Sequence, residues 1–105
     1  FAERLPAEAR RNVEFVEHFE QGARRSCADI EAGLDRGDFQ LTRRAAHTLV
    51  GASANMGATR LEAVAVAMEQ AADRQDAVAL RPLIGAARTR LDAALAELKA
   101  LQKGP

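Results

Sequence analysis

The sequence is short of several residue types, and each shortage excludes a class of protein. Its 105 residues contain no tryptophan, no tyrosine and a single cysteine, Cys27. One cysteine excludes an intrachain disulfide and, with no histidine nearby, is a poor basis for a metal or redox site. We therefore expect Cys27 to be a small core residue. The 15 basic and 15 acidic residues cancel, so the charge does not indicate a nucleic-acid binder.

Long apolar runs are also absent. No stretch approaches the ~20 residues that a membrane span needs, and the first residues, FAERLPAEARR, lack the charged start and apolar middle of a signal peptide. We expect a cytoplasmic protein without membrane contact. The chain begins at Phe1 rather than methionine, as expected of a piece of a longer protein or a processed chain. Its length suits one domain, residues 1–105, and is too small for a large multi-part enzyme.

Helix-forming residues are abundant. Ala, Leu, Glu and Arg dominate and β-branched residues are sparse, which favours helix nearly throughout. Apolar residues recur at helical spacing in four stretches, which predict four buried stripes. The predicted core residues are Val16, Phe19, Ala23, Cys27, Ile30 and Leu34; Leu41, Ala45, Leu49, Ala52 and Met56; Leu61, Val64, Met68 and Ala72; and Leu80, Ile84, Ala87, Leu91, Ala94, Leu98 and Leu101.

Turn residues separate the four stretches. We expect the first helix, over about 7–36, to stop at Gly37, Asp38 to cap the second and Gly57 to end it. The polar DRQD at 73–76 separates the last two. Connections this short favour antiparallel neighbours. The sequence therefore predicts an all-α, antiparallel up-down-up-down four-helix bundle, with a short opening segment around Pro6 that could cap one end.

His47 points away from the predicted core. At about 100° per residue, it lies about 150° from the centre of its own helix's apolar stripe. Gly51, at i+4, and Ala54, one turn further, share or border its face. A glycine in an exposed helix costs roughly 1 kcal/mol relative to alanine, but a missing side chain lets another protein approach the ring. We expect Gly51 and Ala54 to form a low docking surface beside His47.

Phosphoryl acceptance is the chemistry that suits such a histidine. An exposed imidazole is largely neutral near neutral pH, so one ring nitrogen keeps a nucleophilic lone pair. Arg43 and Arg44, one turn earlier, place positive charge where a phosphoryl group would be partly neutralised. The sequence has no Gly-rich phosphate loop, Walker lysine or obvious magnesium carboxylate cluster. We therefore expect no ATP site, and a partner must supply donor and acceptor.

The segment HTLVGASANMG, residues 47–57, resembles the signature of histidine phosphotransfer (HPt) domains, roughly H-x-L-K-G-[SA]-[SA]-x-x-[LIM]-G. The flanking LDRGDFQLTRRAAHTL and GATRLEAVAVAMEQAA look like the family's neighbouring helices, so the likeness covers about residues 12–100. It implies a four-helix bundle that relays a phosphoryl group between aspartates of response-regulator receiver domains, or takes it from a kinase. By position, His47 would be phosphorylated and Gly51 would permit receiver approach; Leu49, Met56 and Gly57 would be structural.

The resemblance also implies partners. These would be receiver domains and a hybrid sensor histidine kinase, in the same chain or a separate one. We expect a phosphocarrier that is a monomer, binds no nucleic acid and holds no metal or cofactor of its own. Magnesium is expected on the partner receiver domain only.

Val50 stands where the family usually has lysine, a residue thought to help hold the phosphoryl group or the partner's acidic pocket. One hypothesis is that Arg43 or Arg44 supplies the missing charge; another is that Val50 adds an apolar contact to a receiver. The two arginines could equally be a solvated pair. Ser53 and Asn55 could be partner contacts or helix-end residues.

Other functions compete with phosphotransfer. The dimerisation bundle of a sensor histidine kinase also exposes a helix histidine, but typically follows it with an acidic residue and soon a proline, whereas Thr48 follows His47. A degenerate HPt domain would act as an adaptor, binding receivers without transfer. A carboxylate-bridged metal bundle needs Glu three residues before His, where Arg44 and Phe15 stand. His18, about 130° from its helix's stripe, is expected to be an ordinary surface residue.

Overall fold

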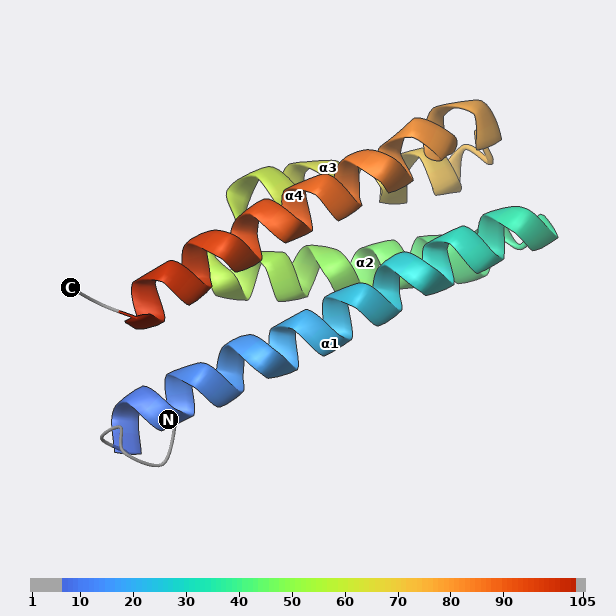
Figure 1. Ribbon diagram of the computed structural model, residues 1–105. Coiled ribbons are helices and arrows are strands. Elements are labelled where there is room, and N and C mark those ends of the chain that lie inside the picture. The colour runs from blue at the N-terminus through green and yellow to red at the C-terminus, as the bar shows by residue number, and fades with distance from the viewer. Residues whose placement is uncertain (1–6, 104–105) are drawn as a thin grey trace.

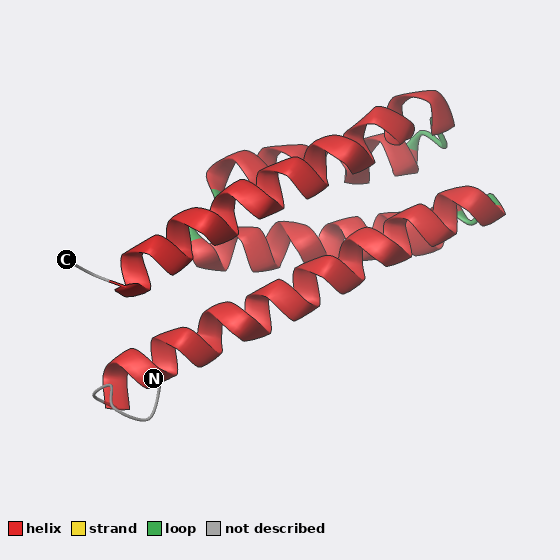
Figure 2. Ribbon diagram, in the orientation of Figure 1, coloured by secondary structure: helices red, strands yellow, loops and turns green. Residues whose placement is uncertain are grey.

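Four helices make up almost all of the chain that the structure describes. The computed structural model describes residues 7–103, so the expectations for Pro6 and the opening segment lie outside it. Within these residues there is no strand (Figure 2), and no helix is long and apolar enough to cross a membrane. The helices are α1 (Ala7–Arg36), α2 (Phe39–Met56), α3 (Thr59–Asp73) and α4 (Ala77–Lys103).

The helices run alternately up and down around one core. Helix α1 packs on α2, α2 on α3, α3 on α4, and α4 back on α1, so each has two neighbours (Figure 1). Because each connection is only two or three residues long, sequential helices are antiparallel. The predicted all-α four-helix bundle is confirmed.

The turn residues act as predicted. Gly37 has a φ of 71°, in the left-handed region that favours glycine after a helix, and Asp38 caps α2 by accepting a hydrogen bond from Leu41 N at 3.0 Å. Gly57 ends α2 with a φ of 69°. Its N–H donates to Ala54 O at 3.1 Å. These cap hydrogen bonds at Asp38 and Gly57 fix where α2 begins and ends.

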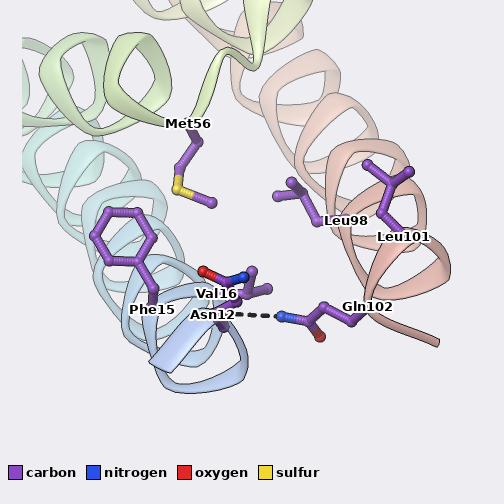
Figure 3. A pocket seen from close by; sticks show the side chains of 7 residues that line it. All are labelled: Asn12, Phe15, Val16, Met56, Leu98, Leu101 and Gln102. Atoms are coloured by element: carbon purple, nitrogen blue, oxygen red, sulfur yellow. Dashed lines mark hydrogen bonds between the residues drawn. The ribbon is translucent and has the colours of Figure 1, made fainter. Parts of the chain in front are cut away.

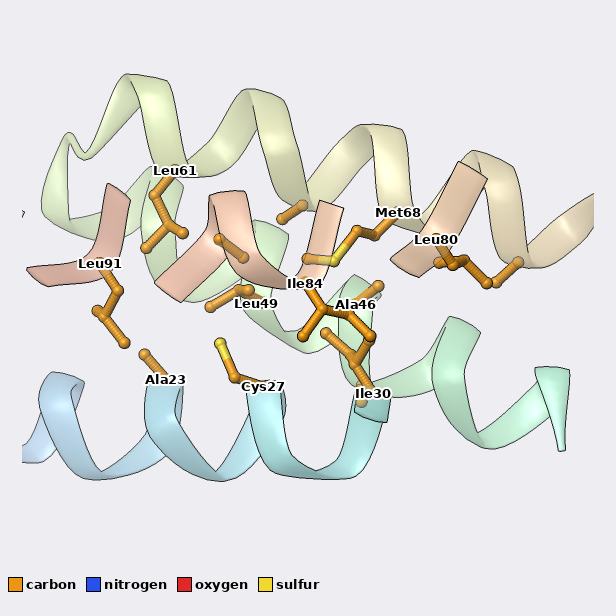
Figure 4. Packing of buried hydrophobic residues seen from close by; sticks show 14 of the residues in the cluster. Ala23, Cys27, Ile30, Ala46, Leu49, Leu61, Met68, Leu80, Ile84 and Leu91 are labelled. Atoms are coloured by element: carbon orange, nitrogen blue, oxygen red, sulfur yellow. The ribbon is translucent and has the colours of Figure 1, made fainter. Parts of the chain in front are cut away.

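Predicted and observed cores agree best in α1, where all six residues of the stripe are buried. Cys27 is only 3% exposed, so its assignment to the core is confirmed, and burial raises the pKa of its thiol. Figure 4 shows three of the α1 side chains, those of Ala23, Cys27 and Ile30, facing side chains of the other helices. In α3, Val64 is only half-buried, and Ala65 and Ala71 complete the core there.

The predicted core face of α2 was wrong by part of a turn. Leu41, Ala52 and Met56 are only half-buried, whereas residues outside the apolar stripe are fully buried. The residues of α2 that lie in the core are Thr42, Ala45, Ala46, Leu49 and Ser53.

Two hydroxyl residues explain this shift. Thr42 Oγ1 donates to Ile30 O at 3.1 Å and Ser53 Oγ donates to Leu49 O at 2.7 Å, so both polar groups are satisfied in the interior. The expectation that Ser53 could contact a partner is therefore wrong. Gly33 of α1 permits this close packing, because a Cβ there would lie 2.9 Å from the backbone N of Thr42.

Helices α1 and α4 are longer than α2 and α3. Helices α1 and α4 have 30 and 27 residues against 18 and 15 in α2 and α3, and they overhang at the end where the chain termini lie (Figure 1). Leu101, predicted as core, is therefore 77% exposed and Leu98 half-buried, while Leu95 lies in the core. An apolar cleft between the overhanging turns is bridged by a hydrogen bond from Gln102 Nε2 to Asn12 O at 2.9 Å (Figure 3).

Candidate functional site

His47 lies in the middle of α2 on the side away from the core. Its side chain is 73% exposed, and Nδ1 lies 2.8 Å from Oε2 of Glu69 on α3. A carboxylate only accepts hydrogen bonds, so Nδ1 carries the proton and donates it. The lone pair of the neutral ring is then on Nε2, which has no hydrogen-bond partner among the side chains described, those of residues 12–102.

Two carboxylates of α3 also engage Arg43. Its Nε lies 3.5 Å from Asp73 Oδ1, and its Nη1 lies 3.9 Å from the same Glu69 oxygen that faces His47. Arg44 is exposed and makes no ion pair within the described part of the chain. A shallow hollow around His47 is lined by Arg43, Arg44, Thr48 and Glu69. The structure thus gathers both predicted arginines around the histidine, but in different settings.

The residues expected to form a low surface lie on the exposed side of α2. Gly51 and Ala54 are exposed, and a Cβ on Gly51 would meet no atom within 4 Å. Within the residues that the structure describes, packing therefore does not require a glycine at that position. Val50 is half-buried and packs against the core, so only part of its side chain can reach the surface beside His47.

A second hollow lies on the other flank of α2, between α1 and α2. It is lined mainly by apolar and aromatic side chains, and Thr48 borders both this hollow and the one around His47. Its largest exposed residue is Phe15, which is 57% exposed. The lining residues are Phe15, His18, Phe19, Thr48, Ala52, Asn55 and Met56. His18, expected to be an ordinary surface residue, is part of this groove.

Glu69 was missed by the sequence reasoning, although a signal for it exists. In an antiparallel helix pair joined by a tight turn, residues equally distant from the turn lie at about the same level along the two helices. His47 lies ten residues before Gly57, and Glu69 lies eleven after Ala58. Glu69 lies outside the apolar stripe of α3, so a prediction based on apolar spacing alone does not find it.

Metal ligands do not gather in the described residues. No group of three or more His, Cys, Asp or Glu side chains in residues 7–103 is placed to hold a metal ion. The carboxylates near His47 are Glu69, which contacts both His47 and Arg43, and Asp73, which contacts Arg43.

Comparison with known proteins identifies the family. A family model described as Hpt domain matches residues 14–101, which covers parts or all of the four helices and the segment around His47. No curated protein and no solved structure matches the chain. Hpt domains are phosphocarriers of phosphorelays that interact with response-regulator receiver domains. The extent of the match and the four-helix bundle agree, and the chain belongs to the Hpt domain family.

Proposed function

We propose that this domain accepts a phosphoryl group on His47 from a receiver-domain aspartate, or from a kinase, and passes it to the aspartate of another receiver. The observation that carries the proposal is the 2.8 Å hydrogen bond between His47 Nδ1 and Glu69 on a side chain that is 73% exposed. It supports a ring with a defined tautomer, whose free nitrogen is open to a second protein.

The transfer balances without any further reactant. Nε2 attacks the phosphorus of the aspartyl phosphate, the N–P bond forms, and the P–O bond breaks with its electron pair leaving on the aspartate carboxylate. The Nδ1 proton stays in place, so the phosphorylated ring carries a positive charge. The Glu69 carboxylate at 2.8 Å faces that charge and stabilises it. Transfer to the second receiver reverses these steps.

Residues on both flanks of His47 support receiver docking. Gly51 and Ala54 leave the surface low, and the groove between α1 and α2 offers Phe15 as an apolar anchor. A receiver that covers both would exclude water from the ring during transfer. The core is closed by four helices of one chain, which supports a monomeric carrier. The magnesium expected for the reaction belongs to the receiver.

Val50 favours a second candidate, an adaptor that binds receivers without accepting phosphate. The family's lysine would put a cation at this position, whereas Val50 is apolar and half-buried against the core. Such a domain would keep the docking groove and lose the chemistry. The two candidates differ only in whether a bound phosphoreceiver labels the domain.

The deciding experiment compares the two histidines of the chain. Wild type, His47→Gln and His18→Gln are incubated with phosphorylated receiver domains and, separately, with the small donor phosphoramidate. We expect acid-labile label on wild type and His18→Gln and none on His47→Gln. Label on His47→Gln would reject the site, and receiver binding without any label on wild type would establish the adaptor.

A further inference from the structure

Arg43 and Arg44 lie on opposite flanks of His47. At about 100° per residue, Arg43 lies about 40° around α2 from His47 on one side, and Arg44 lies about 60° on the other. The contacts identify the sides. Arg43 pairs with carboxylates of α3, whereas Thr48, on the flank of Arg44, borders the groove between α1 and α2. Two adjacent residues of the same type therefore face different surroundings.

The charge of Arg43 is already compensated. Its guanidinium lies 3.5 Å from Asp73 and 3.9 Å from Glu69, so one cation serves two carboxylates. Arg44 has no such partner among the side chains described, those of residues 12–102, yet it lines the same hollow as His47. An anion that arrives in this hollow meets Arg44 as the uncompensated cation of the pair.

The geometry of the ring decides on which flank the anion arrives. The two nitrogens of an imidazole point away from each other, so directing Nδ1 at Glu69 turns Nε2 away from α3. A phosphoryl group on Nε2 therefore lies away from Glu69 and Asp73, whose charges would repel it. It lies on the flank of Arg44, and a guanidinium is well suited to bind phosphoryl oxygens.

We propose that the two arginines have separate tasks, an inference that rests on His47 being the phosphoryl acceptor. Arg44 binds the phosphoryl group on Nε2 and supplies the charge that lysine at position 50 would give. Arg43 is a positioning residue that holds Glu69 against the ring and offsets the negative charge of α3.

Phosphoramidate tests this division without a partner protein. The rate at which it labels His47 is measured for wild type, Arg43→Ala, Arg44→Ala and Arg44→Lys. We expect Arg44→Ala to slow labelling about fivefold, the size of one exposed charge contact, and Arg44→Lys to restore most of the rate because it keeps the charge. Arg43→Ala should slow labelling less than twofold. Equal slowing by the two alanine variants, or no slowing by Arg44→Ala, would overturn the proposal.

Nitrogen NMR of the unphosphorylated ring supplies the readout for positioning. Arg43→Ala should shift the His47 imidazole ¹⁵N signals, because Glu69 loses a neighbour, whereas Arg44→Ala should leave them as in wild type. Shifts of the same size in both variants would contradict separate tasks. Unlabelled wild type, or labelled His47→Gln, would instead reject the function on which the inference rests. Both arginines are exposed, so we expect each variant to fold. Thermal melting checks that it does.

Discussion

Two seams of the bundle carry ion pairs, and they are built differently. Between α1 and α4, charged side chains form ion pairs that are spread along the length of both helices, an arrangement we call the α1–α4 seam. Its cross-helix pairs are Glu20 with Lys99, Arg24 with Asp92, Glu31 with Arg88 and Asp35 with Arg81, at 3.0 to 3.2 Å. Exposed pairs of this kind each contribute little stability, but their spacing favours one register of α1 against α4.

The α2–α3 seam concentrates its charges at one point. Arg43 contacts both Glu69 and Asp73. Glu69 also contacts the His47 ring. A purely structural seam has no need to direct a carboxylate at an exposed imidazole. The ion pairs between α1 and α4 are thus spread along the helices, whereas those between α2 and α3 are gathered beside His47, the proposed nucleophile.

The largest expected effect comes from removing one carboxylate from each seam, because only the α2–α3 carboxylate contacts His47. We expect Glu69→Gln to slow phosphotransfer to His47 by about tenfold to a hundredfold, because the ring loses the group that fixes its tautomer. Glu31→Gln, the matched change in the α1–α4 seam, should leave the rate unchanged. The measurement is the rate at which a phosphorylated receiver labels each variant. Equal rates for the two variants would contradict a role of Glu69 in transfer.

Two exposed glycines offer the next largest contrast. A Cβ on Gly51 or on Gly22 meets nothing within 4 Å, so alanine at either position should raise the free energy of unfolding by about 0.5–1 kcal/mol. Only Gly51→Ala should also slow transfer from a receiver, by several-fold, since its methyl group meets the docked partner. Denaturant unfolding measures the stability of the two variants, and the rate of labelling by a phosphorylated receiver measures transfer. Unimpaired transfer in Gly51→Ala would show that this glycine is not needed for access.

Breaking a pair in the α1–α4 seam should have a smaller effect, on stability alone. Arg88→Ala removes the 3.0 Å contact with Glu31 and is expected to lower the free energy of unfolding by about 0.5 kcal/mol. The loss should shrink in high salt, which screens exposed charges. Urea unfolding at two salt concentrations measures it; a loss of several kcal/mol would mean that the seam is a major source of stability.

The smallest expected effect is the pH dependence that Glu20 contributes. Hydrogen bonds from Lys99 and then Arg24 lower the pKa of its carboxyl below the ordinary value of 4.5. A lowered pKa in the folded state stabilises the protein above pH 4.5, and this contribution disappears as the pH falls through the lowered value. Glu20→Gln should therefore be less stable than wild type at pH 6, and the gap should close at lower pH. A gap that is independent of pH would point to packing instead.

The helices and the exposed histidine were predictable from local features. Glycine and N-cap residues set the ends of α2, and the stripe of α1 is apolar throughout, so spacing alone located both. The family signature placed His47. These features depend on residues within one or two turns of each other, which is the range over which a single sequence carries direct information.

The parts that were not predicted depend on contacts between helices. Thr42 and Ser53 lie in the core because each hydroxyl finds a carbonyl acceptor, and polarity alone suggests the opposite. Glu69 gains its importance only from the register of α3 against α2. The contrast between Arg43 and Arg44 likewise requires knowing that Asp73 faces one of them.

The two-residue turn after α2 makes the length of a connection part of the chemistry. One residue inserted beside Gly57 would rotate α3 by about 100° and move it by about 1.5 Å relative to α2. Glu69 would then leave the ring although neither side chain had changed. Surface connections usually tolerate insertions. Here, selection for a working nucleophile would act on the spacing of a turn ten residues away from it, in addition to selection for the core, because the same rotation would turn the buried face of α3 out of the bundle.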